Sequence, residues 1–227
     1  MNDFSTSFTA RQQPRRQPAR DFPSVLRFLA HLVSYVFHPL FISSYVMGFL
    51  LFLHPYAFTG FDHQVKMLRF FHVVIFNCLF PALVVFLSWR LKFIQSMHLR
   101  TTKERIIPYL VTMIFYWWTW NVFKNLGDMP PVSVHFALGA FLAICGAWMC
   151  NIYYKISMHA VATGGAMMFF LLFAFSDNYT SGLYPSVAIL VTGTVCTARL
   201  INREHTPFEI WSGLFVGMLA QWIAWLF

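Results

Sequence analysis

The residues best suited to chemistry in this sequence are an arginine, a histidine and a glutamate between two apolar segments. Arg199, His205 and Glu209 lie in the run ARLINREHTPFEI, with five residues between the first two and three between the last two. A carboxylate near an imidazole can hold the ring in one tautomer, and an arginine can hold an anion for the imidazole to attack. The spacing therefore predicts a nucleophilic site for an anionic substrate.

The same stretch has a second interpretation that needs no chemistry. Residues 206–209 have the sequence TPFE, the pattern of a helix capping box with proline at the first helical position. On this interpretation the Glu209 side chain reaches back to the backbone and has no role at His205. A glutamate here can cap and orient together, so Arg199 and His205 carry most of the hypothesis.

The composition indicates a membrane protein. The 227 residues are 58% hydrophobic and 11% charged, whereas a water-soluble domain carries about 25% charged residues. The basic residues behind the net charge of +8 lie beside apolar segments, so anionic lipids and not nucleic acid are the expected partners. The four cysteines lack metal-ligand or disulfide spacing, and we expect no metal and no cofactor.

Hydropathy predicts an all-α fold, a polytopic transmembrane helix bundle of about seven spans, with six acceptable, because one crossing needs about 20 apolar residues. Residues 1–23 are predicted to be a disordered basic arm, since they lack the features of a signal peptide. Residues 24–227 form a single transmembrane domain, which 24–33 enter as an interfacial lead-in. The predicted spans are 32–54, 68–89, 106–123, 132–150, 156–175, 185–201 and 207–227.

Seven spans place the arm and three polar segments on one side of the membrane. These segments are 90–105, 151–155 and 199–206, and with the arm and the lead-in they carry 13 of the 16 lysines and arginines. The positive-inside rule makes this side cytoplasmic. We therefore expect a multi-pass protein of a cell membrane, a bacterial inner membrane, with no obligate protein partner.

The three polar segments each contribute residues that suit phosphate chemistry. The basic loop 90–105 would by default set the topology and anchor lipid headgroups. Only Arg105 stands out within it, because it lies at the membrane edge. Five other histidines show no ligand-like spacing and are predicted to be structural: His38, His54, His63, His72 and His135. The candidates within motif regions 98–108, 155–159 and 199–209 are His98, Lys103, Arg105, Lys155, Ser157, His159, Arg199, His205 and Glu209.

These segments resemble the motifs of the type 2 phosphatidic acid phosphatase superfamily of membrane lipid phosphatases. The third family motif is Ser-Arg, five residues, His, three residues, Asp. Arg199 and His205 match it, with alanine in place of the serine and Glu209 in place of the aspartate. The second family motif, Pro-Ser-Gly-His, is matched by residues 156–159 with the sequence ISMH.

The first family motif, Lys, six residues, Arg-Pro, is the weakest match. Arg105 has His98 seven positions before it, where the family has lysine, and the nearest proline is Pro108. The resemblance covers roughly residues 98–217, about half of the chain.

The resemblance implies a metal-independent membrane phosphatase that hydrolyses a phosphomonoester or diphosphate on a lipid. His205 would be the nucleophile and form a phosphohistidine, Glu209 would orient its ring, and His159 would protonate the leaving oxygen. Arginine forks suit the equatorial oxygens of a transferring phosphoryl group. The residues that would bind phosphate are Arg199, Arg105, Lys155, Ser157, Lys103 and His98. Candidate substrates are polyprenyl diphosphate, phosphatidic acid, phosphatidylglycerol phosphate and a lipid A phosphate.

Departures from the family pattern support an alternative of another class. Met158 replaces a glycine that permits close approach of the backbone to phosphate, and His98 replaces a permanent cation. The site would then be a catalytically inactive one that binds or transports a lipid phosphate. A purely structural membrane subunit is less favoured, because charged residues beside a bilayer are costly without a role. Bacterial members of the family usually present the site to the periplasm, whereas the charge count places it in the cytoplasm.

Overall fold

The computed structural model describes residues 22–93, 105–176 and 182–227, and every regular element in these ranges is helical. The all-α prediction is confirmed for this part of the chain. Nearly all of the predicted arm, with His98 and Lys103, lies outside the described residues. The elements are α1 (Ser24–Val36), α2 (Pro39–Gly48), the π-helical η1 (Phe49–Leu53), α3 (His63–Val73), the π-helical η2 (Val74–Leu79), α4 (Phe80–Arg90), α5 (Ile106–Asn125), α6 (Pro131–Tyr153), α7 (Met158–Ser176), α8 (Leu183–Ile201) and α9 (Pro207–Trp225).

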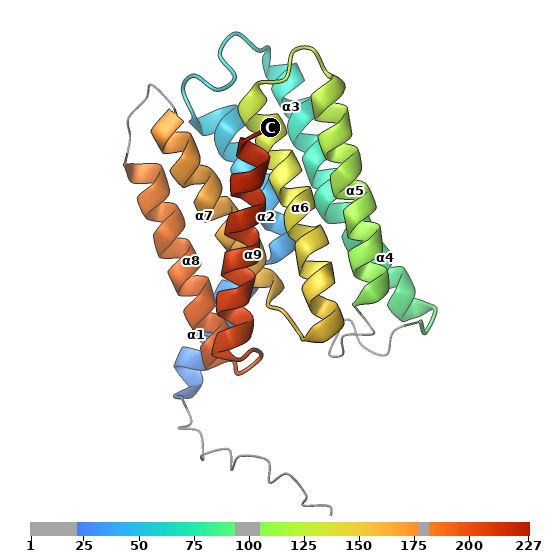
Figure 1. Ribbon diagram of the computed structural model, residues 1–227, viewed down its shortest axis with the longest axis vertical. Helices are drawn as coiled ribbons and strands as arrows, with labels where there is room; N and C mark the ends of the chain where they lie inside the picture. Colours follow the sequence, from blue (N-terminus) through green and yellow to red (C-terminus); the bar gives the residue numbers. More distant parts are fainter. Residues whose placement is uncertain (1–21, 94–104, 177–181) are drawn as a thin grey trace, which may run out of the picture.

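The long helices run up and down alongside one another, as Figure 1 shows. The ends of α4, α6 and α8 and the beginnings of α5, α7 and α9 lie at the same end of the bundle, next to α1. The C-terminus lies at the opposite end. The fold thus gathers the described parts of all three predicted polar segments at one end.

Among the described residues, four helical segments are long and apolar enough to cross a membrane: His63–Arg90, which joins α3, η2 and α4, together with α6, α7 and α8. The bent pair of α1 and α2–η1 makes a fifth if it is counted as one span. The structure therefore supports a membrane protein with transmembrane helices but does not confirm the predicted seven spans. The helices α5 and α9 have 20 and 19 residues, the length of a span, but are rich in amphipathic Trp and Tyr rings.

The predicted first span, 32–54, is broken at its proline. The axes of α1 and of α2–η1 meet at 60°. Pro39 lacks an N–H and disfavours helical backbone in the residue before it, and His38 is extended with ψ 139°. The His38 ring then caps α2, since its Nδ1 accepts a hydrogen bond from the Leu40 N–H at 3.4 Å. Residues before the proline therefore belong to a separate helix that turns away from the span.

Large apolar side chains fill the bundle toward the end remote from the polar segments. Leu50, Phe123 and Phe169 are each at most 1% exposed there and belong to one apolar cluster. At the same end, a guanidinium nitrogen of Arg69 lies 3.1 Å from a carboxylate oxygen of Asp128, which ties α3 to the loop before α6.

Glycines bring α7 and α9 into backbone contact. A Cβ atom at Gly217 would lie 2.0 Å from the carbonyl oxygen of Val161, and one at Gly164 would lie 2.8 Å from that of Leu214. Small residues spaced four apart permit this approach of helix backbones. The contact sets the beginning of α9 directly beside the beginning of α7.

We predict that Gly217→Ala destabilises the protein by about 1–3 kcal/mol, because the added methyl group overpacks the α7–α9 contact. The matched control is Gly193→Ala on α8, where a new Cβ would meet no atom within 4 Å. Alanine raises helix propensity there, so the control gains up to about 1 kcal/mol. Thermal unfolding in detergent checks both variants, and equal unfolding temperatures would contradict the role of the glycine.

Candidate functional site

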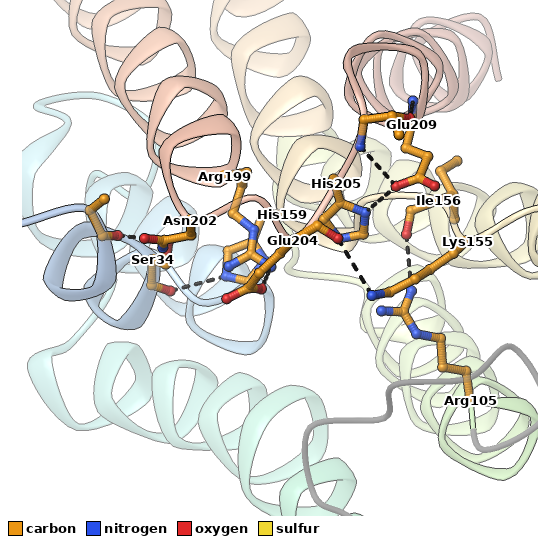
Figure 2. Close-up of polar contacts among 12 residues, drawn as sticks. Ser34, Arg105, Lys155, Ile156, His159, Arg199, Asn202, Glu204, His205 and Glu209 are labelled. Atoms are coloured by element: carbon orange, nitrogen blue, oxygen red, sulfur yellow. Dashed lines mark hydrogen bonds and ion pairs between the residues drawn. The ribbon is translucent and has the colours of Figure 1, made fainter. Parts of the chain in front are cut away.

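One cavity of about 520 Å³ reaches the end of the bundle where the polar segments meet. Its wall includes side chains from all three predicted segments: Arg105 before α5, Lys155 before α7, His159 on α7, Arg199 on α8 and His205 before α9. Figure 2 shows these side chains directed toward one another from their separate elements. The fold therefore builds one site from positions up to a hundred residues apart.

The His205 ring is held in one tautomer. Its Nδ1 lies 2.8 Å from Oε2 of Glu209 (Figure 2). An ionised carboxylate only accepts hydrogen bonds, so Nδ1 carries the proton and Nε2 keeps a lone pair. His205 lines the cavity whereas Glu209 does not, which is the arrangement of a nucleophile with an orienting group behind it.

Glu209 also caps α9. Its Oε2 accepts a hydrogen bond from the Thr206 N–H at 3.1 Å, and its own N–H donates to the Thr206 hydroxyl at 3.3 Å. The two interpretations of the sequence are therefore compatible, because one carboxylate oxygen serves both the helix end and the imidazole of His205.

Burial keeps the His205 imidazole neutral. Loss of hydration lowers its pKa to about 4, from an ordinary value of 6.5. The hydrogen bond to Glu209 raises this pKa, while the positive charges of Arg199 and Lys155 lower it. At pH 7 the ring is therefore in the form whose Nε2 can attack an electrophile.

Arg199 is a buried cation whose hydrogen bonds are incompletely satisfied. A terminal guanidinium nitrogen forms an ion pair with the carboxylate of Glu204. Its Nε atom is buried without a hydrogen-bond partner among the described residues. Buried polar atoms are rarely left unpaired, so a free donor beside the cavity suits an anionic ligand. Glu204 lies where such an anion would compete for the guanidinium.

Two further cations stand beside Arg199. Arg105 donates a hydrogen bond to the carbonyl oxygen of Ile156 at 3.0 Å, and the Lys155 ammonium lies 3.5 Å from the carbonyl oxygen of Glu204. Partial burial lowers the pKa of Lys155, and Arg105 lowers it further through its positive charge. The clustering of three cations makes this end of the cavity electropositive and suited to phosphate.

The Nε2 atom of His159 forms a hydrogen bond with α1. Its Nε2 lies 3.0 Å from the backbone carbonyl oxygen of Ser34. Since a carbonyl only accepts, Nε2 carries a proton, and Nδ1 is the ring atom that remains for other chemistry. The ring of His38 packs edge-on against it with centroids 5.5 Å apart.

Sequence reasoning missed three contributors to the site. His38 was predicted to be structural but lines the cavity, and Glu204 and Ser34 were not considered, although both lie in its wall. A histidine directly before a proline inside an apolar segment was the available signal, because that pair breaks a helix and exposes polar groups. The ion pair between Glu204 and Arg199 had no such signal.

Not all of the predicted phosphate ligands reach the cavity. Ser157 is fully buried, is absent from the cavity wall, and spends its N–H on the carbonyl oxygen of Glu209 at 3.2 Å. Met158, at the family's glycine position, lines the cavity and accepts a hydrogen bond from the Tyr109 hydroxyl at 2.8 Å. The remaining two, His98 and Lys103, lie outside the described residues.

Among the residues described, no three His, Cys, Asp or Glu side chains gather closely enough to hold a metal ion. That the chemistry needs no metal or cofactor stays a prediction. Comparisons of the chain with protein-family models, with characterised proteins and with solved structures found no match.

We predict that Glu204→Gln tightens the binding of inorganic phosphate about fivefold, because it removes an ion pair of about 1 kcal/mol that competes for Arg199. The matched control is Asp128→Asn, which removes the same charge from the ion pair at the far end of the bundle. Calorimetric titration with phosphate measures both. Equal affinities in the two variants would show that Glu204 does not compete with the anion.

The pH response of His205 is a second measurable consequence. In NMR titrations of ring-labelled protein, its midpoint should lie near pH 4, and Glu209→Gln should move the midpoint lower still. The sign follows because the Glu209 hydrogen bond favours the charged imidazolium, so weakening it lowers the pKa. His205→Gln assigns the resonance. A midpoint near the ordinary 6.5 would contradict the effect of burial.

Proposed function

We propose that the protein is an integral membrane phosphatase that hydrolyses a phosphomonoester or diphosphate on a lipid through a phosphohistidine. The observation that carries the proposal is the His205 ring, whose Nδ1 proton is held by Glu209 while the ring lines a cavity beside Arg199. A neutral imidazole, a fixed tautomer and a neighbouring cation are the requirements of a nucleophile that attacks phosphorus.

In the proposed first step, the Nε2 lone pair of His205 attacks phosphorus, and the bond to the leaving oxygen breaks, which is the ester oxygen of a monoester or the bridging oxygen of a diphosphate. The electron pair leaves with that oxygen, which takes a proton from Nδ1 of His159. The negative charge of the bound phosphate favours the doubly protonated imidazolium that this step requires. Water then attacks the phosphohistidine, returns a proton to His159, and releases phosphate. Arg105, Lys155 and Arg199 stabilise the equatorial oxygens, whose negative charge must be matched throughout.

The proposal includes seven crossings with the site on the cytoplasmic side. The long α9 packs along α7 through its glycines, and α5 runs beside the other helices in Figure 1, so both share the path of the four apolar segments. The excess of lysine and arginine at the site end supports the sidedness. It remains a proposal, as does a bacterial inner membrane.

A non-catalytic lipid-phosphate binding or transport protein is the second candidate. Two contacts favour it: Glu204 already occupies the guanidinium of Arg199, and Nε2 of His159 is engaged by the carbonyl oxygen of Ser34. Such a protein would bind lipid phosphate saturably without releasing phosphate. Its binding would be lost in Arg199→Ala and kept in His205→Ala.

Phosphate release from phosphatidic acid and polyprenyl diphosphate in EDTA tests the proposed reaction. We expect turnover by the purified protein and a loss of about a thousandfold or more in His205→Ala, because the nucleophile is removed. The matched control is His63→Ala, since this exposed residue begins α3 at the opposite end of the bundle. A phosphorylated peptide containing His205, found by mass spectrometry after rapid quenching, would identify the intermediate.

Activity that survives His205→Ala would overturn the assignment of the nucleophile. Activity that EDTA abolishes would overturn the metal-independent mechanism. Saturable binding of the lipids with no turnover would select the second candidate.

A further inference from the structure

The charged site fills only one end of the cavity. The remainder runs into the bundle between α2, α4, α5, α6 and α7 and reaches α9 at one residue, Gln221. In this deep section, no lining residue that the structure describes is charged. Much of the wall is formed by small side chains on α6 and α7: Gly139, Ala140, Ala143, Ala162, Gly165 and Ala166.

The depth of the cavity follows from helix geometry. Tyr116 lines it eleven residues beyond Arg105, and Gln221 lines it fourteen residues beyond Pro207. At about 1.5 Å per residue, these positions lie about 16 and 21 Å along their helices from the site end. The hydrocarbon core of a bilayer is about 30 Å thick, so the cavity extends through more than half of that distance.

The polar groups of the deep section are already paired with protein atoms. The Ser43 hydroxyl donates to the Tyr116 hydroxyl at 3.2 Å, and the Gln221 amide donates to the carbonyl oxygen of His135 at 3.2 Å. Phe136 lines the inner end, where its ring packs edge-on against the Phe169 ring with centroids 5.0 Å apart. The deep section thus presents a largely apolar wall.

The cavity has room for a hydrocarbon chain. Its volume, including the charged end, is about 520 Å³.

We propose that this deep section binds one hydrocarbon chain of the lipid whose phosphate lies at Arg199 and His205. The protein then holds this chain inside the bundle and not in the bilayer. The inference rests on the proposed function for the position of the phosphate. Ala162 and Ala166 line successive levels of the channel, about 6 and 12 Å beyond the start of α7.

Calorimetric titration with a series of alkylphosphonates tests this directly. Their carbon–phosphorus bond is not a phosphate ester, so binding is measured without turnover. The protein is held in nanodiscs, empty nanodiscs give the background, and inorganic phosphate probes the head site alone. Each methylene that enters the channel from water should tighten Kd about fourfold, from about 0.8 kcal/mol per buried methylene. The affinity should level off once the chain reaches Phe136.

Two leucine variants locate the chain. With Ala162→Leu, the affinity should level off at a shorter chain length than with Ala166→Leu. Both variants should level off at a shorter chain length than the unmodified protein, because leucine blocks the channel at two depths. The matched control is Ala82→Leu, an exposed position on α4 outside the cavity wall, which should leave the series unchanged. Inorganic phosphate should bind all four proteins within about twofold.

A chain-length dependence that continues without levelling off, as in empty nanodiscs, would overturn the proposal. So would the same levelling point in both channel variants and in Ala82→Leu. If the leucine variants no longer bind inorganic phosphate, the series on the unmodified protein alone decides. Alkylphosphonate binding as expected, with no release of phosphate from any lipid, would overturn the phosphatase and leave the chain site standing. Release of phosphate from a lipid, together with alkylphosphonate binding that neither channel variant changes, would overturn the chain site and leave the phosphatase standing.

Discussion

The backbone contact between α7 and α9 is the constraint on which the site depends. Gly217 and Gly164 let the two helices approach until a single added methyl group would collide with a backbone carbonyl. Because both helices begin at the same end of the bundle, this approach fixes His159 and His205 relative to one another. In a membrane such contacts replace the hydrophobic effect as the source of helix association. The spacing of these two histidines and the stability of the bundle therefore rest on the same glycines.

Two carboxylates balance the charge that this arrangement concentrates. Glu209 holds the Nδ1 proton of His205 and caps α9 with the same oxygen. Glu204 pairs with Arg199, which would otherwise be a buried cation without a counter-ion. A buried charge is tolerated only when it is paired, so Arg199 needs an anion at this position. In the proposed function, a phosphate would supply the same charge and take the place of Glu204.

The bundle is packed unevenly along its length. At the far end, large apolar side chains such as Phe123 and Phe169 are closely packed. Toward the site, alanines and glycines on α6 and α7 leave a channel open beneath the cations. Native interiors seldom leave such volume empty, so the channel suits a ligand whose charged and apolar parts are joined in one molecule.

The sequence by itself determined the helical class, the apolar segments and the polar intervals that hold Arg105, His159, Arg199, His205 and Glu209, because hydropathy and spacing are local properties. It could not determine the direction in which the chain turns before Pro39, because that direction depends on the packing of α1 against α8. Nor could it place His38 and Glu204 in the site or Ser157 outside the cavity wall, since side-chain neighbours across helices leave no periodic trace. The channel was equally invisible, because it is the space that several helices leave between them. Tertiary structure alone decides what several helices enclose.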